Sequence, residues 1–252
     1  MRRYPSSRAA SYSFGPGPLS PAIRALIIAN VVVFAVQILL PGLTRYLGLI
    51  PADLIERLRV WQPFTYMFLH GSFFHILFNM LALWMFGTEL EGIWGTRYFL
   101  WYYFATGLAA AATTVAVSLL PFAVFGQIYA AATIGASGAI YGLLLAYALY
   151  FPNRPVYMYL VFPIPSKYFV MIIGAIAFLS SISNAGGAVA HSAHLGGLVA
   201  GYVILSRGRI PIRLNPWTEV KYRYLRWRLE RAKRRFGVYP GGRRDDWDRR
   251  IH

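Results

Sequence analysis

The sequence contains few side chains that could act as nucleophiles or acid–base groups. There is no cysteine, which excludes thiol catalysis and cysteine-ligated zinc. Ser137 lies in Gly135-Ala136-Ser137-Gly138, where the flanking glycines leave its hydroxyl accessible and allow a substrate backbone to approach closely. A serine nucleophile needs a base within hydrogen-bonding distance, and His194 is a candidate. His75 and Asn79 are further polar side chains in an otherwise apolar stretch, and such side chains usually face a site.

The composition is that of a membrane protein. Of the 252 residues, 57% are hydrophobic and 13% are charged, whereas a soluble domain carries about 25% charged residues. The apolar content excludes a disordered chain, and the lack of cysteine excludes a disulfide scaffold. The net charge of +16 comes largely from residues 207–252, which hold 15 basic and 5 acidic groups, so it does not indicate nucleic-acid binding.

Charge-free runs predict the number of membrane spans, because a helix needs about 20 apolar residues to cross a hydrocarbon core of ~30 Å. Four runs contain no Asp, Glu, Lys or Arg: 25–44, 60–88, 98–153 and 168–206. The last two are long enough for two helices each, and turn-like segments divide them. We therefore predict an all-α polytopic membrane protein with six transmembrane helices, at 22–40, 64–88, 98–119, 131–151, 168–183 and 188–206.

The distribution of Lys and Arg predicts the orientation. With the N-terminus in the cytoplasm, 22 of the 25 basic residues lie on the cytoplasmic side, and an even number of spans places both termini there. The chain then consists of a cytoplasmic tail (1–21), a six-span domain (22–206) and a basic cytoplasmic tail (207–252). We expect the plasma membrane of a prokaryotic cell, with a mitochondrial targeting signal in the first tail as the alternative.

Three segments outside the spans have distinctive patterns. The long first loop, residues 41–63, mixes charged with apolar residues, which favours one short interfacial helix over a seventh span. Residues 155–165 are apolar but too short to cross a membrane. Residues 217–236 interleave aromatic and leucine side chains with arginines. That pattern suits either a helix on anionic lipid or a solvated tail that satisfies the positive-inside rule.

Three polar side chains on non-consecutive spans are predicted to share one depth. His75, Ser137 and His194 lie 14, 14 and 13 residues from the cytoplasmic ends of their spans. At ~1.5 Å per residue, each lies roughly 20 Å above the cytoplasmic boundary. Polar groups at membrane depth are costly and usually face a site. The common depth therefore favours a serine nucleophile and a histidine base over unrelated structural roles.

Helical phase separates the histidines of the second span. His75 and Asn79 are four residues apart and share one face, whereas His70 lies about 140° from His75 around the helix. We expect His70 near the outer rim, where it tethers the loop by hydrogen bonds. Tyr141, one turn below Ser137, is placed to pack beneath an imidazole.

Small residues are spaced for close packing of the fourth and sixth spans. Gly138-x3-Gly142 and Ala193-x3-Gly197-x3-Gly201 are small-xxx-small patterns, which let helix backbones approach closely. A serine–histidine hydrogen bond of ~2.6–3.2 Å requires such an approach.

Taken together, these motifs resemble those of the rhomboid family of intramembrane serine proteases. His70-x4-His75-x3-Asn79, Gly135-Ala136-Ser137-Gly138 and Ala193-His194-Leu195-Gly196-Gly197-x3-Gly201 are similar to its three signatures, in its order. Glu91-x3-Gly95 also matches a family feature. In the first loop, Trp61-Gln62-Pro63 replaces the family's usual Trp-Arg, which leaves the anchoring of that loop open.

The resemblance implies roles for individual residues. Ser137 would be the nucleophile and His194 the base of a Ser-His dyad without a third, acidic member. His75, Asn79 and the Ser137 N–H would form the oxyanion hole, with Gly135 shaping it. Tyr141 would lie under the base, and His70 would be structural. The resemblance further implies cleavage of transmembrane segments of other membrane proteins, with no cofactor or metal. Either the third loop or the fifth span would admit the substrate.

Two other classes of function are weighed against this one. The four histidines at 70, 75, 191 and 194 could hold a metal, but no carboxylate is predicted at their depth, and the pattern His-Glu-x-x-His is absent. An inactive rhomboid relative would bind membrane helices without cutting them. Such relatives lose the serine or the histidine, and this sequence retains both.

Overall fold

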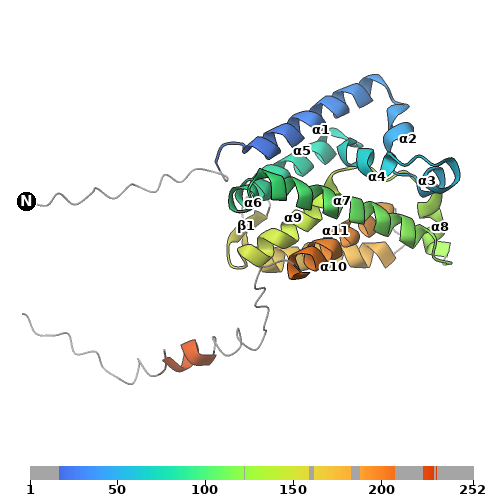
Figure 1. Cartoon of the computed structure of the whole chain (residues 1–252). Helices are drawn as coiled ribbons and strands as arrows, with labels where there is room; N and C mark the ends of the chain where they lie inside the picture. Colours follow the sequence, from blue (N-terminus) through green and yellow to red (C-terminus); the bar gives the residue numbers. More distant parts are fainter. Residues whose placement is uncertain are drawn as a thin grey trace, which may run out of the picture. The chain divides into compact units, whose positions relative to one another are not determined.

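The structure, a computed structural model, describes residues 17–121, 123–158, 162–182, 188–207, 224–229 and 231 (Figure 1). The chain divides into two compact units, residues 1–210 and 211–252. The predicted surface helix at 217–236 falls largely outside the described residues. Its described part, 224–229, is helical with exposed side chains. Binding of this segment to lipid stays a prediction.

In the first unit, the described residues from 17 to 207 form a helical bundle. Its longer helices are α1 (Pro21–Leu39), α5 (Phe73–Ala82), α7 (Thr96–Ser118), α9 (Ser137–Tyr150), α10 (Ser166–Ile182) and α11 (Ala188–Arg207). A π-helical turn, η2 (Leu83–Gly87), carries α5 on into α6 (Thr88–Trp94). The shorter helices are α2 (Leu43–Leu47), α3 (Pro51–Arg57), α4 (Gln62–Thr65), the 3-10 turn η1 (Tyr66–Phe68) and α8 (Ala123–Ala130).

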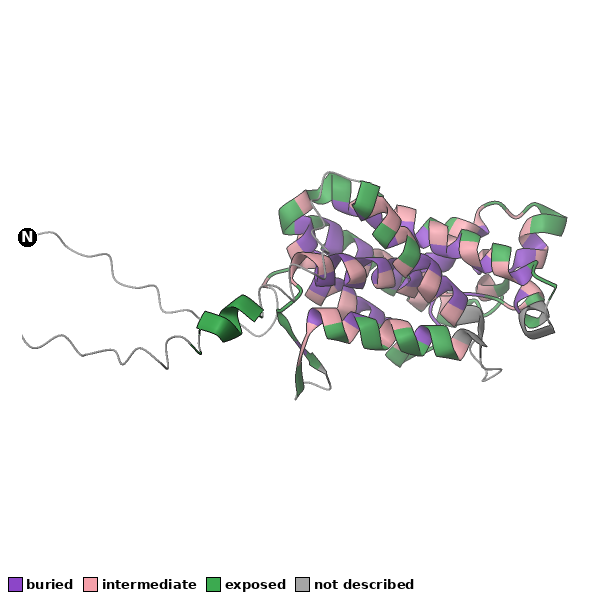
Figure 2. Ribbon diagram, turned by 90° about the horizontal axis from the view of Figure 1, so that it is seen from below, coloured by how far each residue is buried: buried purple, intermediate pink, exposed green. Residues whose placement is uncertain are grey.

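The core lies where α7, α9 and α11 pack together, with α10 against α11 and α1 against α5 and α7 (Figure 1). Most side chains of α9 are buried. The outward faces of α1 and α10 instead expose large apolar residues such as Val32 and Leu179 (Figure 2). A bundle with a buried centre and an apolar outer surface suits a bilayer, because lipid tails solvate such a surface.

Each of the six predicted spans falls on a helical segment of the structure. Among the described residues, three helical segments are long and apolar enough to cross a membrane: Pro21–Leu39, Phe73–Trp94 and Thr96–Ser118. Ser137–Tyr150 and Ser166–Ser180 are apolar but shorter. The unit is therefore a helical membrane domain, and the number of six crossings stays a prediction.

The predicted start of the second span, at residue 64, is wrong. The helix begins at Phe73, because Ser72 is extended and its Oγ accepts the N–H of His75 (3.2 Å), which caps the first turn. Residues 62–68 form α4 and η1 instead. His70 thus precedes the helix, so the predicted helical phase does not describe its position. The first loop likewise contains several short helices rather than one.

The predicted helical class is confirmed, but residues 155–165 add an antiparallel hairpin of β1 (Pro155–Met158) and β2 (Phe162–Pro165), which was not predicted. Its prolines disfavour a helix interior, and β-branched and aromatic side chains favour strands. The hairpin base fixes the start of α10: the Ser166 N–H donates to the Arg154 carbonyl (2.9 Å), and the Lys167 N–H to the Pro152 carbonyl (3.3 Å). The Ser166 hydroxyl also donates to the Phe151 carbonyl (2.5 Å).

Glu91 joins the first turn of α1 to α6 and α7. Its buried carboxylate accepts hydrogen bonds from the Ser20 hydroxyl, the Ala22 N–H (3.0 Å), the Ile23 N–H (3.3 Å) and the Thr96 hydroxyl (2.6 Å). The first N–H groups of a helix lack intrahelical acceptors and carry the positive end of the helix dipole. A carboxylate is therefore well suited to this position.

Replacing Glu91 is expected to loosen the attachment of α1. Glu91→Ala leaves two buried N–H groups unpaired, which should lower the free energy of unfolding by about 3 kcal/mol and the Tm in detergent by roughly 6 °C or more. Glu89→Ala is the matched control. Glu89 pairs with Arg154 near the surface, so its loss should cost less than about 1 kcal/mol. Equal Tm values for the two variants would contradict this assignment.

Candidate active site

Ser137 is the first residue of α9, and the chain reaches it through residues 133–136, called here the nucleophile loop. Gly135 in this loop has a φ of +122°, which glycine adopts without steric cost. Its N–H donates to the Tyr66 carbonyl (2.9 Å). Because Ser137 begins the helix, its own N–H has no intrahelical acceptor and lies at the positive end of the helix dipole. Ser137 therefore offers both a hydroxyl and a main-chain donor.

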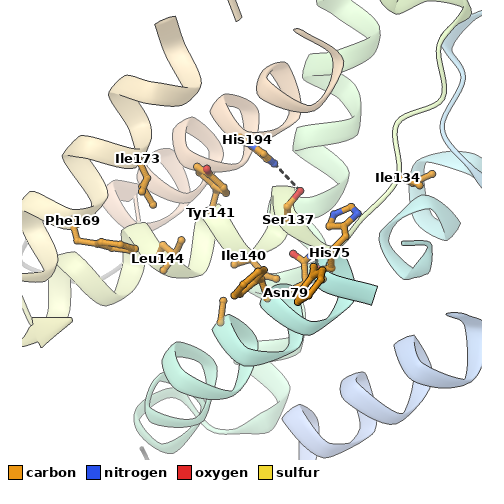
Figure 3. Close-up of a pocket in the computed structure, with 13 residues that line it drawn as sticks. His75, Asn79, Ile134, Ser137, Ile140, Tyr141, Leu144, Phe169, Ile173 and His194 are labelled. Atoms are coloured by element: carbon orange, nitrogen blue, oxygen red, sulfur yellow. Dashed lines mark hydrogen bonds between the residues drawn. The ribbon is translucent and has the colours of Figure 1, made fainter. Parts of the chain in front are cut away.

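His194 on α11 faces this serine. Its Nε2 lies 2.8 Å from the Ser137 Oγ (Figure 3). Tyr141 stacks on the imidazole, with ring centroids 4.2 Å apart and planes inclined by 5°. The Nδ1 atom of His194 has no hydrogen-bond partner among the described residues. Stacking and packing, rather than a carboxylate, therefore orient this ring.

The glycine pattern allows α9 and α11 to approach closely enough for this pair. A Cβ on Gly197 would overlap the Gly138 carbonyl oxygen. A Cβ on Gly201 would lie 2.6 Å from the Tyr102 hydroxyl and 3.2 Å from the Cα of Gly142. The Tyr102 hydroxyl donates to the Gly142 carbonyl (2.8 Å), which ties α7 to the same contact. The structure thus brings together the small residues that the sequence singled out.

His75 approaches the nucleophile loop from α5. A Cβ on Gly135 would lie 2.8 Å from His75 Nε2, so the imidazole directly faces this glycine. The Gly71 N–H donates to His75 Nδ1 (3.3 Å). In a neutral ring, an accepting Nδ1 leaves the proton on Nε2. His75 is therefore oriented to donate a hydrogen bond on the Ser137 side.

Asn79 lies one turn further along α5 and is buried. Its Nδ2 donates one hydrogen bond to the His75 carbonyl (2.9 Å). Since an amide nitrogen carries two hydrogens, a second donor remains.

A cavity of about 450 Å³ opens beside the Ser137–His194 pair. Its polar lining consists of His75, Asn79, Ser137, Tyr141 and His194. The remaining lining is apolar and comes mainly from α5, α9 and α10, including Phe74, Phe78, Ile140, Leu144, Phe169 and Ile173 (Figure 3). A peptide bond at Ser137 would thus have room for apolar side chains beside it.

Comparison with known proteins identifies the family to which this chain belongs. Residues 57–207 match the Rhomboid domain. The chain belongs to the rhomboid family. The rhomboid protease GluP of Bacillus subtilis is 34% identical over 152 residues, 60% of this chain and 26% of that protein. The mitochondrial Rhomboid protein 1 of Saccharomyces cerevisiae is 32% identical over 136 residues, 53% of this chain and 38% of that protein.

The rhomboid protease GlpG of Serratia proteamaculans is 29% identical over 188 residues, 75% of this chain and 62% of that protein. The chain therefore spans less than two thirds of the length of each of these rhomboids.

His70 and His191 do not join the Ser137–His194 pair. His70 is buried, and its main-chain N–H donates to Gln37 Oε1 on α1 (3.0 Å). Its ring packs edge-on against His75, with centroids 5.0 Å apart, and neither ring nitrogen has a partner among the described residues. The tether expected of His70 is thus made by its main chain. The His191 ring lies 5.8 Å from that of His194. Among the described residues, no group of three or more His, Asp or Glu could hold a metal ion.

Sequence reasoning missed the main-chain contacts that orient this site. The Gly71 N–H that holds His75 and the Tyr66 carbonyl that holds Gly135 leave no signal in residue type. The α10 side chains Phe169 and Ile173 were assigned only to a span, because an apolar helix presents similar residues to lipid and to a cavity.

Adding a methyl group at the contact between α9 and α11 is expected to move Ser137 and His194 apart. Gly197→Ala places a methyl group on the Gly138 carbonyl, so α9 and α11 must move apart and any activity of Ser137 should fall by ~10²-fold or more. Gly174→Ala is the control. Gly174 lies in α10, where the nearest atom to a new Cβ is Leu198 Cδ1 at 3.4 Å, an ordinary contact. Its activity and Tm should match the unmodified protein. Substrate cleavage and thermal unfolding measure both, and a fully active Gly197→Ala variant would contradict this role of the contact.

Proposed function

We propose that this chain is an intramembrane serine endopeptidase that cleaves transmembrane segments of other membrane proteins. The observation that carries the proposal is the 2.8 Å approach of His194 Nε2 to Ser137 Oγ, between two helices of an apolar bundle. Membership of the rhomboid family and similarity to proteins named as rhomboid proteases support it. Ser137 and His194 are the catalytic residues in this proposal.

The reaction is acyl transfer through a dyad. His194 Nε2 takes the proton of the Ser137 hydroxyl while Oγ attacks the substrate carbonyl. The resulting oxyanion is stabilised by the Ser137 N–H, His75 Nε2–H and Asn79 Nδ2–H. His194 then gives its proton to the leaving amine, and the C–N bond breaks. Water, deprotonated by the same imidazole, attacks the acyl-enzyme and restores the Ser137 hydroxyl.

The cavity supports a route for the substrate between α5 and α10. Phe74 and Phe78 line it from α5, and Phe169 and Ile173 line it from α10. The only lining residue on the segment between α7 and α9 is Ile134, among those the structure describes. The lining therefore favours access past the fifth span over access past the third loop. An apolar lining also favours an unwound transmembrane segment over a soluble peptide.

The topology is part of the same proposal. We assign six spans to α1, α5–α6, α7, α9, α10 and α11, with both termini in the cytoplasm of a prokaryotic cell. Basic residues support the assignment, because those in or next to these helices lie at the ends predicted to be cytoplasmic: Arg24, Arg97, Arg154, Lys167 and Arg207. Ser137 lies at the opposite end of α9.

The decisive experiment compares site variants in detergent with a panel of single-span substrates. Ser137→Ala and His194→Ala should each abolish cleavage, because each removes one member of the dyad. Ser192→Ala and His191→Ala are matched controls, expected within about threefold of the unmodified protein. Ser192 Oγ lies 3.4 Å from Thr114 Oγ1 on α7, and His191 does not line the cavity.

Two reagents separate the proposal from its alternatives. A fluorophosphonate should label Ser137, and a chelator should leave cleavage unchanged. Loss of cleavage with chelator and its return with zinc would favour a histidine-bound metal. No cleavage of any substrate together with no labelling would favour an inactive relative that only binds membrane helices.

A second set of variants tests the oxyanion donors. His75→Ala and Asn79→Ala should each lower kcat by ~10²-fold or more with little change in Tm. His70→Ala should instead lower Tm, because it empties a buried position, and should reduce kcat less than about tenfold. The assignment is wrong if the His70 variant keeps a normal Tm yet loses kcat as fully as the His75 variant.

A further inference from the structure

Three main-chain hydrogen bonds hold the nucleophile loop, two of them to Leu49 of the first loop and one to Tyr66 of η1. The Leu49 N–H donates to the Thr133 carbonyl (3.0 Å), and the Thr133 N–H donates to the Leu49 carbonyl (2.8 Å). Two residues further on, the Gly135 N–H donates to the Tyr66 carbonyl (2.9 Å). Because residues 133–136 lead directly into Ser137, the position of Leu49 sets the position of the nucleophile loop.

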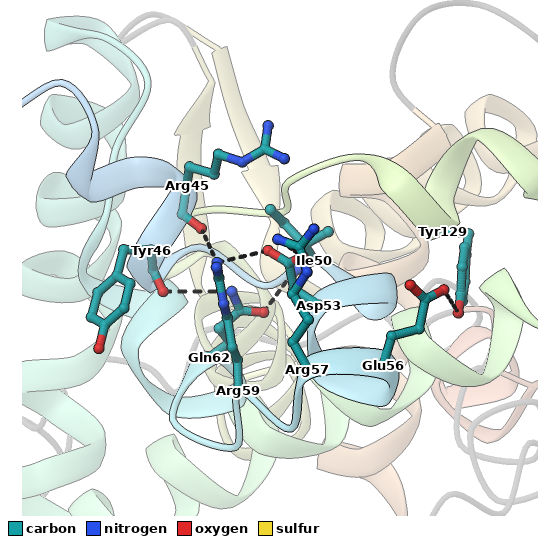
Figure 4. Close-up of polar contacts among 9 residues, drawn as sticks. All are labelled: Arg45, Tyr46, Ile50, Asp53, Glu56, Arg57, Arg59, Gln62 and Tyr129. Atoms are coloured by element: carbon teal, nitrogen blue, oxygen red, sulfur yellow. Dashed lines mark hydrogen bonds and ion pairs between the residues drawn. The ribbon is translucent and has the colours of Figure 1, made fainter.

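The segment around Leu49 is in turn held by side chains from residues 59–65. Three successive carbonyls at the end of α2, which have no intrahelical donors, each accept a hydrogen bond from a side chain of this segment. Arg59 Nη1 donates to the Arg45 carbonyl (3.2 Å), Trp61 Nε1 to that of Tyr46 (2.9 Å), and the Thr65 hydroxyl to that of Leu47 (2.6 Å). Figure 4 shows the first of these contacts, from Arg59 to the Arg45 carbonyl. The segment is thus fixed residue by residue up to Leu47.

Gln62 holds the segment on both sides of Leu49. It is fully buried, and its Oε1 accepts the N–H of Ile50 (3.1 Å) (Figure 4). Its Nε2 lies 3.5 Å from the Tyr46 carbonyl, a longer contact. Without this side chain, the Ile50 N–H next to Leu49 would be a buried donor with no acceptor, which is costly to leave unpaired. The anchoring that the sequence left open at Trp61-Gln62-Pro63 is therefore made by the glutamine amide.

We propose that Gln62 is a positioning residue for the nucleophile loop. Its amide holds Ile50, and thereby keeps Leu49 in register with Thr133. That pairing fixes Gly135 against His75 and fixes the N–H of Ser137. The inference rests on the proposed protease function, because it assigns to Gln62 a part in the geometry of the oxyanion donors. Such donors act over a narrow range of ~2.7–3.1 Å, so a small displacement of the loop is costly.

The test compares Gln62→Met with Tyr129→Phe. Methionine has a similar length and no amide, so it fills the space but leaves the Ile50 N–H without an acceptor. Tyr129→Phe is the matched control, because the Tyr129 hydroxyl donates to Glu56 Oε1 (2.8 Å) and thereby ties the first loop to α8 at a residue outside 45–50. Both variants are assayed well below their own Tm values, so that unfolding does not contribute.

We expect Gln62→Met to lower kcat by at least ~10-fold with KM changed less than threefold, and Tyr129→Phe to leave both within twofold. Partial unfolding of the variant would instead lower the fraction of active enzyme and the Tm together. Unchanged kcat in folded Gln62→Met, or a change confined to KM, would overturn the inference.

Hydrogen exchange separates this inference from the proposed function. In Gln62→Met, the amides of Thr133 and Gly135 should exchange at least ~10-fold faster, as measured by mass spectrometry of peptides covering 131–136. The amides of α11 should be unchanged. This readout does not require catalysis. Unchanged exchange at residues 131–136 would therefore refute the role of Gln62, whereas absent cleavage by the unmodified protein would refute only the protease function.

Discussion

The approach of α9 to α11 with no side chain between them is the constraint on which the rest of the structure depends. Gly138 and Gly197 leave the two backbones in contact, and the Ser137–His194 hydrogen bond forms one helical turn or less away from that contact. The close helix contact and the hydrogen bond together hold the pair in place. Tyr141 extends the same contact by stacking on the imidazole.

This constraint explains why the neighbouring segments are so heavily hydrogen-bonded. Ser137 is the first residue of α9, so its position depends on the position of the nucleophile loop that precedes it. The chain before it has no regular structure of its own apart from its pairing with Leu49. Its geometry must be supplied from elsewhere, by the first loop and by Tyr66. The buried Asp53, which pairs with Arg59 at 2.7 Å, stabilises that first loop from within.

The sequence predicted best what depends on hydrophobicity. Charge-free runs located the helices of the bundle, and His75, Ser137 and His194, which counting along helices predicted at one depth, line one cavity. The glycine spacing predicted which helices meet. The helix start at Phe73 was missed, because a serine such as Ser72 caps a helix only when the local backbone is extended. The hairpin was missed because residues 155–165 were judged only by their length against a membrane crossing.

Main-chain contacts were beyond the reach of sequence reasoning for a different reason. Any residue provides an N–H and a carbonyl, so the bonds of Gly71 to His75 and of Gly135 to Tyr66 depend on folding rather than on residue type. The sequence raised the question of what Gln62 does, because this residue stands where the family usually has an arginine. Its answer required the positions of Ile50 and Tyr46.

The hairpin has a mechanical consequence for α10. Its pairing and the hydrogen bonds of Ser166 and Lys167 pin the first residues of this helix. If α10 moves as a rigid helix held at its first residues, it can only rotate about those residues. Over its 17 residues, a swing of about 10° would carry the far end roughly 4 Å, but would displace Phe169 by less than about 1 Å. Any such rotation of α10 would thus displace its last residues most and the cavity-lining Phe169 least.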